Sequence, residues 1–145
     1  KNKTLISKAS KKFGSQCIII LIDAKKIKKN KWQVFIDKGR EKTGLDVFEW
    51  AKFAEKSGVG EIHLNSIDKD GTREGFDIDL IKKFSKNIKV PIIIGGGLGN
   101  IFHIKKLLKI KNIEGITTST AIHYRDLRII DIKKSIREEN INVRY

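Results

Sequence analysis

The chain has 145 residues, of which 39% are hydrophobic, and this is enough apolar material for one domain with a sizeable core. With 31 Lys and Arg against 17 Asp and Glu, the formal net charge of +14 suits nucleic acid, acidic membranes or phosphorylated small molecules, and charge alone does not choose among them. The sequence carries neither a zinc-finger spacing nor an RNP box, so we do not expect a nucleic-acid partner. The densest lysine stretch, residues 25–31, is interpreted as a solvated loop.

The sequence gives no sign of a membrane segment. The longest apolar run, Cys17 to Ile22, is far shorter than the roughly 20 residues of a membrane-spanning helix, so no membrane partner is expected. No charged-then-apolar signal segment opens the chain, which predicts a cytoplasmic location. The single cysteine, Cys17, lies in that run and is expected to be a buried thiol. Because the chain contains no methionine, we expect it to be processed or a piece of a longer protein.

Short apolar runs alternate with helical patterns along the chain. Four runs lack strict polar alternation, which predicts parallel strands covered on both faces, at residues 17–22, 61–66, 90–94 and 115–118. Helices are predicted at 4–13, at 45–57, from Asp77, from Asn100 and at 127–139.

Local signals refine this pattern. Thr43 is the predicted cap of the helix at 45–57, and Gly58 its stop. The segment Lys31–Lys38 is predicted to form part of a small hairpin after the first run. One helix followed by four strand–helix units indicates an α/β fold with a parallel sheet, and without any linker residues 1–145 are predicted to be a single domain.

Candidate site residues follow the predicted strands, because ligands of α/β folds bind beyond the carboxyl ends of parallel strands. Asp23 follows the first run and suits general acid or base chemistry, with a turn-forming Asp as the alternative. Asp68 and Asp70 follow the second run. We expect Asp70, beside Gly71, to face the site, with a solvated turn as the alternative.

Two further segments suit a phosphate group. Gly95–Gly99 lies between a strand and a helix, where small residues let an anion reach backbone N–H groups. Thr118–Thr120 ends the last run and can supply hydroxyl and N–H groups to the same phosphate.

No metal and no cofactor is expected. The segment Asp68–Gly71 lacks the remaining ligands of a calcium loop, and the glycine run departs from the dinucleotide fingerprint G-x-G-x-x-G. The histidines His63, His103 and His123 share no metal-ligand spacing, and His63, inside a strand, is interpreted as a satisfied core residue.

Taken in order, several strings closely resemble the cyclase subunit family of imidazole glycerol phosphate synthase. They are FGSQCIIILIDAK (13–25), TG (43–44) followed by EWA (49–51), GEIHLNSIDKDGT (60–72), GG (96–97) and NVRY (142–145). The match runs over the whole chain but covers only the C-terminal half of that family's (βα)8 barrel. The resemblance therefore implies the fifth to eighth strand–helix units of a TIM barrel.

The resemblance also implies a lyase and cyclase activity in histidine biosynthesis. The family takes ammonia from a partner glutaminase and reacts it with a phosphoribulosyl formimino aminoimidazole carboxamide ribonucleotide. The products are imidazole glycerol phosphate and aminoimidazole carboxamide ribonucleotide. The other catalytic aspartate and a second phosphate site belong to the first half of the barrel, so this chain alone is expected to be inactive. Because four strands cannot close a barrel, the chain is also expected to self-associate.

Individual residues match the family's functional positions. Asp23 resembles the general acid that helps to expel the leaving group, and Glu61 resembles a residue of the ammonia gate. The residues that match substrate-binding positions are Gly39, Asp70 and Gly71, with Gly96, Gly97, Ser119 and Thr120 at the phosphate.

Two departures from the family keep other functions open. Lys38 and Gly95 stand where the family usually has serine, and both positions belong to the substrate end. A cyclase-like paralogue of surface-sugar amidation is therefore one alternative, and a non-catalytic phosphate-binding half-barrel is another.

Overall fold

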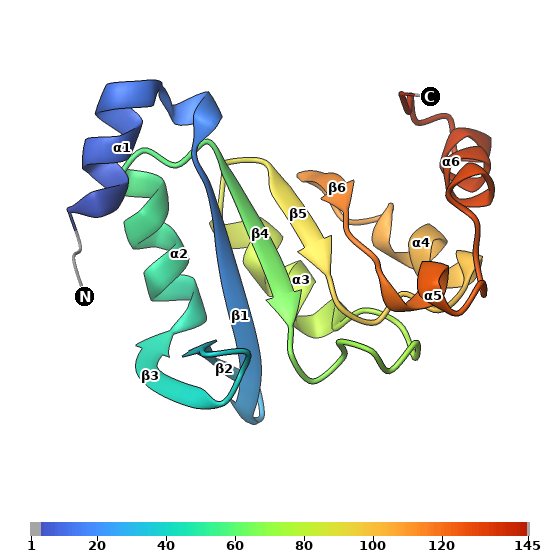
Figure 1. Cartoon of the computed structure of the whole chain (residues 1–145), viewed down its shortest axis with the longest axis horizontal. Coiled ribbons are helices and arrows are strands. Elements are labelled where there is room, and N and C mark those ends of the chain that lie inside the picture. Colours follow the sequence, from blue (N-terminus) through green and yellow to red (C-terminus); the bar gives the residue numbers. More distant parts are fainter. Residues whose placement is uncertain (1–3, 145) are drawn as a thin grey trace.

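The computed structural model describes residues 4–144, which form one six-stranded sheet flanked by helices (Figure 1). The strands are β1 (Ile19–Lys28), β2 (Lys31–Ile36), β3 (Glu41–Asp46), β4 (Glu61–Ser66), β5 (Ile92–Gly95) and β6 (Ile113–Ile116). The helices are α1 (Leu5–Phe13), α2 (Val47–Lys56), α3 (Ile78–Asn87), α4 (Ile101–Leu107), α5 (Thr120–His123) and α6 (Ile129–Glu138), with a single 3-10 turn at Ser15–Cys17.

Parallel pairing dominates the sheet, whose strand order is β3-β2-β1-β4-β5-β6. The strands β1, β4, β5 and β6 pair in parallel, whereas β2 pairs antiparallel with both β1 and β3. Helices connect the parallel strands in turn, as right-handed crossovers require. The predicted α/β fold is confirmed, and its repeating units are those of part of a TIM barrel.

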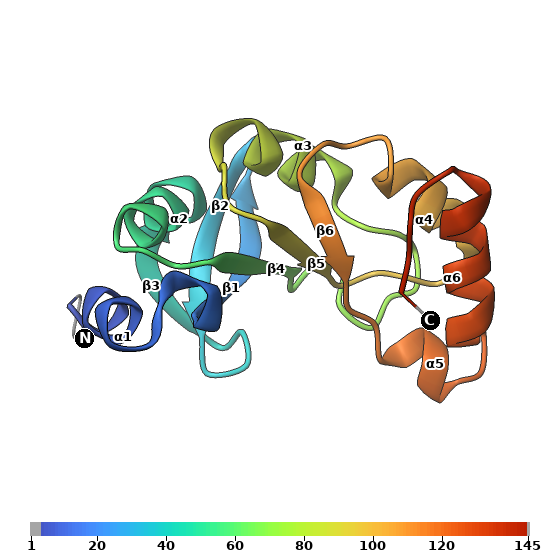
Figure 2. The ribbon, with the colours of Figure 1, turned by 90° about the horizontal axis from the view of Figure 1, so that it is seen from above.

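Within residues 4–144, helices cover one face of the sheet and leave the other open. Viewed from above, α2, α3 and α4 lie along the same side of the strands (Figure 2). Ile62 and Leu64 of β4 point to that side and are buried. On the opposite face Ile19 and Leu21 of β1 are 54% and 56% exposed. The expectation of strands covered on both faces was therefore wrong, because four parallel strands form an open arc whose inner face stays uncovered.

The caps of α2 and α3 come from aspartates. Asp46 accepts hydrogen bonds from the backbone N of Phe48 (2.9 Å) and of Glu49 (3.2 Å) at the start of α2. Thr43, the predicted cap, instead lies in β3 and donates its hydroxyl to Val34 O (2.6 Å). The chain stays extended up to Asp46 because β3 pairs with β2, so the cap is displaced by three residues.

The first strand also differs from its prediction. Since β1 begins at Ile19, Cys17 falls in the preceding 3-10 turn and is exposed, which corrects the expectation of a buried thiol. The strand then continues to Lys28, so the lysine stretch interpreted as a loop forms the two arms of a hairpin. The pairing of β1 with β2 begins at Asp23. On the edge of β1 that faces β2, residues 19–22 therefore have no partner strand among the described residues.

No helix within residues 4–144 combines the length and apolar character needed to cross a membrane.

Candidate functional site at the carboxyl ends of the parallel strands

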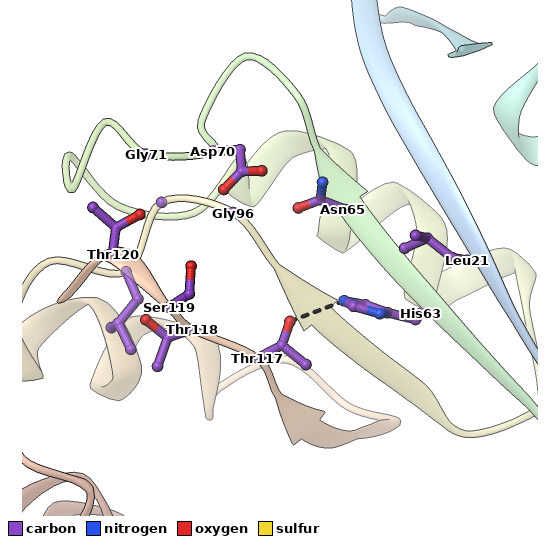
Figure 3. Close-up of a pocket in the computed structure, with 12 residues that line it drawn as sticks. Leu21, His63, Asn65, Asp70, Gly71, Gly96, Thr117, Thr118, Ser119 and Thr120 are labelled. Carbon is purple, nitrogen blue, oxygen red and sulfur yellow. Dashed lines mark hydrogen bonds between the residues drawn. The ribbon is translucent and has the colours of Figure 1, made fainter. Parts of the chain in front are cut away.

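A pocket of about 260 Å³ opens at the carboxyl ends of β4, β5 and β6 (Figure 3). Its walls come from β1 and from the three strand–helix units that begin with β4, β5 and β6, so residues far apart in sequence meet there. The lining residues are Leu21, His63, Asn65, Asp70, Gly71, Gly96, Gly97, Leu98, Thr117, Thr118, Ser119 and Thr120. Six of the predicted substrate-binding positions are brought together in this pocket: Asp70, Gly71, Gly96, Gly97, Ser119 and Thr120.

The glycine loop after β5 presents bare backbone to the pocket. Gly96 and Gly97 have φ values of +86° and +106°, a region that other residues rarely adopt. A Cβ on Gly96 would lie 2.7 Å from Ser66 O, and a Cβ on Gly97 would overlap Gly75 O. The backbone N of Gly75 donates to Gly97 O (2.7 Å). Glycine is required at both positions because the loop packs tightly against the segment that follows β4.

Hydroxyl groups form a further part of the pocket wall. Ser119 and Thr120 lie at the start of the short helix α5, directly after β6. In Figure 3 both residues lie on the side of the pocket away from His63, near the loop that holds Asp70 and Gly71. Hydroxyls and bare backbone at one end of a pocket suit an anionic oxygen group.

The two aspartates of the β4–α3 loop, Asp68 and Asp70, point to different surroundings. Asp68 accepts a hydrogen bond from the backbone N of Lys26 (2.7 Å), which ties this loop to the β1–β2 hairpin. Asp70 is exposed, lies at the pocket, and donates its backbone N to Ser66 O (2.9 Å). The structure thus places only Asp70 at the pocket.

Asp23 lies within β1 rather than at its end, because the strand continues to Lys28. In the parallel register Asp23 is the partner of Asn65. The Asn65 side-chain Nδ2 donates to Asp23 Oδ1 at 3.0 Å, and both side chains are half-buried. Asn65 lines the pocket itself, so the Asp23 carboxylate is held next to it, on the open inner face of the sheet.

His63 belongs to the pocket and not to the core, which corrects its interpretation as a core residue. Its Nε2 lies 2.9 Å from Thr117 Oγ1 (Figure 3), and the residue is half-buried. Burial lowers the pKa of His63, and the negative charge of Asp23 opposes this effect in part. Burial, the larger of the two effects, favours the neutral form of the imidazole.

Two predicted site residues lie outside the pocket. Gly39, with φ +80°, lies in the turn between β2 and β3, where its Cα faces the side chain of Ile67. Glu61 begins β4 and is therefore at the opposite end of this strand from Asp70. The structure brings neither residue to the pocket lining.

Sequence reasoning missed several pocket residues on the inner face, among them His63, Asn65 and Thr117. The signal was present in β4, where every second residue of Glu61–Ser66 is polar up to Asn65. That alternation places His63 and Asn65 on one face. Within residues 4–144, no group of three or more His, Cys, Asp or Glu side chains is arranged to hold a metal ion.

Fold and pocket together define a set of TIM-barrel units with a site at the carboxyl ends of their strands. Residues 1–128 match a family model described as "Histidine biosynthesis protein", and the chain belongs to this family.

Curated relatives agree with the resemblance noted in the sequence. The chain is 42% identical over 145 residues to imidazole glycerol phosphate synthase subunit HisF of Clostridium botulinum (strain 657 / Type Ba4). It is also 42% identical over 144 residues to the HisF subunit of Endomicrobium trichonymphae. These alignments cover 99% of this chain but 57% and 55% of the two relatives, so the chain spans little more than half of their length. The predicted membership of the cyclase subunit family is confirmed.

Proposed function

We propose that this chain forms the carboxyl-terminal half of a cyclase of histidine biosynthesis, as a single half-barrel domain. The complete barrel would use ammonia from a partner glutaminase to convert the phosphoribulosyl formimino aminoimidazole carboxamide ribonucleotide. The products would be imidazole glycerol phosphate and aminoimidazole carboxamide ribonucleotide. Family membership and the HisF relatives support this assignment.

One observation carries the proposal: Asn65 holds the Asp23 carboxylate beside the pocket at 3.0 Å. A carboxyl group fixed by one hydrogen bond and half removed from water suits general acid catalysis. In this proposal Asp23 protonates the leaving group as the ribonucleotide is cleaved.

The phosphate would bind at the glycine loop. Gly96 and Gly97 leave backbone accessible, and Ser119 and Thr120 supply hydroxyl groups in the same pocket. Asp70 and Gly71 would contact the substrate next to this phosphate, whereas Gly39 would contribute through its turn if the turn moves toward the pocket. The excess of positive charge on the chain favours such an anionic ligand.

Ammonia would enter at the opposite end of the strands. Glu61, the first residue of β4, lies at the amino end of the sheet and would form part of the gate that faces the glutaminase. Because the chain spans little more than half of its relatives, it would turn over substrate only in a completed barrel, meaning this chain together with a first half of the same family.

The test is steady-state kinetics of the completed barrel with ammonium salt as the nitrogen source. Asp23→Asn should lower kcat by roughly 10²–10⁴-fold and leave KM within a few-fold, because only proton transfer is lost. Asp79→Asn, which neutralises an exposed aspartate of α3, is the matched control and should leave kcat unchanged. Near-normal turnover of Asp23→Asn would remove Asp23 from the mechanism.

The surface-sugar amidation alternative is supported by two residues at the substrate end. Lys38 lies in the turn between β2 and β3, and Gly95 ends β5; the family usually has serine at both positions. Titration of the completed barrel with the histidine-pathway ribonucleotide and with a nucleotide-linked acetamido sugar separates the two functions. Binding of the sugar alone would favour amidation, and binding of the phosphate without turnover of either would favour a non-catalytic half-barrel.

A further inference from the structure

The inner face of the sheet contains a small polar slot beside Gly95. This residue ends β5, and an ideal Cβ built on it would lie 2.7 Å from Thr117 Oγ1 and 2.8 Å from His63 Nε2. It would also lie 3.1 Å from Asn65 Oδ1. Three polar side chains from β4 and from the segment after β6 thus converge on the place where any other residue would put its side chain. The missing side chain of Gly95 is what lets His63 reach Thr117.

One hydrogen-bonding atom of the slot has no partner among the described residues. Both contacts of the Thr117 hydroxyl are satisfied when it donates to Ile94 O (3.3 Å) and accepts from His63 Nε2 (2.9 Å), and we assign the protons of the slot in this way. The neutral imidazole then has an acceptor, Nδ1, for which the described residues provide no hydrogen bond. Because His63 lines the pocket, this acceptor is available to a bound molecule.

We propose that His63, together with Thr117 and Asn65, is a specificity-determining group that hydrogen-bonds a hydroxyl or N–H group of the substrate next to its phosphate. The inference rests on the proposed phosphate site at Gly96 and Gly97, because these glycines and the residues of the slot line the same pocket. The ligand class is a phosphorylated polyol or sugar, because such a molecule carries hydroxyl donors within a few bonds of its phosphate. Inorganic phosphate carries no hydroxyl group on carbon and no N–H group, so its binding should not depend on the slot.

Two substitutions test the slot by independent routes. His63→Leu removes the imidazole, whereas Gly95→Ala keeps it and fills the space between His63 and Thr117. The atoms nearest to the new methyl group are side-chain ends that can move aside, and Gly95 does not have a positive φ, so the alanine should fold. His123→Leu, which removes an exposed histidine of α5 outside the pocket lining, is the matched control.

The experiment is calorimetric titration of the purified 145-residue chain with inorganic phosphate and with ribose 5-phosphate, because a completed barrel would also carry the second phosphate site of the first half. The unsubstituted protein should bind ribose 5-phosphate more tightly than phosphate. His63→Leu and Gly95→Ala should each weaken ribose 5-phosphate binding by about three- to tenfold, the worth of one hydrogen bond, and leave phosphate binding unchanged. The control should change neither.

The outcomes separate this inference from the function on which it rests. If both variants keep the preference for ribose 5-phosphate while phosphate still binds, the slot is wrong and the phosphate site stands. If the unsubstituted protein binds neither molecule, the proposed phosphate site is wrong, and the proposed role of the slot is overturned as well.

Discussion

Asn65 and Asp23 are register partners on adjacent parallel strands, and their side chains are joined by a hydrogen bond of 3.0 Å from Nδ2 to Oδ1. The bond links β4 to β1 on the inner face, where the sheet has no helical cover. Among the described residues only Oδ1 of Asp23 is held by a side-chain hydrogen bond, so Oδ2 is available to act on a substrate. Asn65 is therefore a positioning residue for the proposed acid.

This relationship predicts a non-additive pair of substitutions. Asn65→Ala in the completed barrel should lower ammonium-dependent kcat about tenfold, because the carboxyl group loses its orientation. In an Asp23→Asn background the same change should have almost no further effect, since there is no acid left to orient. Kinetics of the four proteins measure the coupling, and full additivity would show that Asn65 acts independently of Asp23.

The lowered pKa of His63 predicts how stability depends on pH. Its pKa is below the ordinary value of 6.5 in the folded state, so the unfolded state binds more protons and the free energy of unfolding falls as the pH drops below about 6.5. His103, whose pKa is lowered by burial and by Lys106, acts in the same direction. Urea unfolding at pH 7.5 and at pH 5.5 measures how much free energy of unfolding is lost on acidification. This loss should be smaller for His63→Gln than for the unsubstituted chain. Equal losses would contradict the assigned cause.

Two glycines at the pocket predict different costs for the same substitution. Gly71→Ala meets no atom within 4 Å but keeps a φ of +76°, so it should cost about 1 kcal/mol. Gly97→Ala adds an overlap with the backbone oxygen of Gly75 and should cost about 2 kcal/mol or more. Urea unfolding compares them. If both substitutions lowered the free energy of unfolding equally, the loop would be able to move away from the added methyl group, and the tight packing assigned to it would be wrong.

The uncovered inner face predicts association of the chain with itself. Ile19 and Leu21 are more than half exposed on β1, and the outer edge of β6 has no strand partner among residues 4–144. Light scattering of the purified chain should show a dimer or a larger species. Leu21→Lys should shift the population toward monomer, whereas Lys52→Ala on α2 should not. A stable monomer of the unsubstituted chain would contradict this expectation.

The order of elements was predictable because each helix carries its own signals. Asp77 accepts from Leu80 N (3.1 Å) and Asn100 from His103 N (3.2 Å), as expected where a side-chain oxygen begins a helix. The end of β1 was not predictable from its apolar run. Lys25 and Lys26 stay in the strand because β2 pairs with them, and that pairing depends on residues further along the chain.

The site was predictable to a similar extent. Glycines and hydroxyl residues after the strands indicated one wall of the pocket, since loop composition is a local property. The contact of His63 with Thr117 joins residues 54 positions apart, and it depends on the absence of a side chain at Gly95 between them. A histidine within one strand and a threonine after another strand do not by themselves indicate that their side chains are in contact.

The hairpin formed by β1 and β2 has a consequence for how a barrel could be assembled around this chain. Because β2 occupies the edge of β1 from Asp23 onward, a strand from another polypeptide segment finds only residues 19–22 to pair with on that side. The hairpin therefore acts as a stop that fixes how far along β1 such a strand can extend. A joining strand that is shifted by two residues toward Lys28 would collide with β2. The position at which β2 begins to pair with β1 therefore sets the register in which a barrel can close.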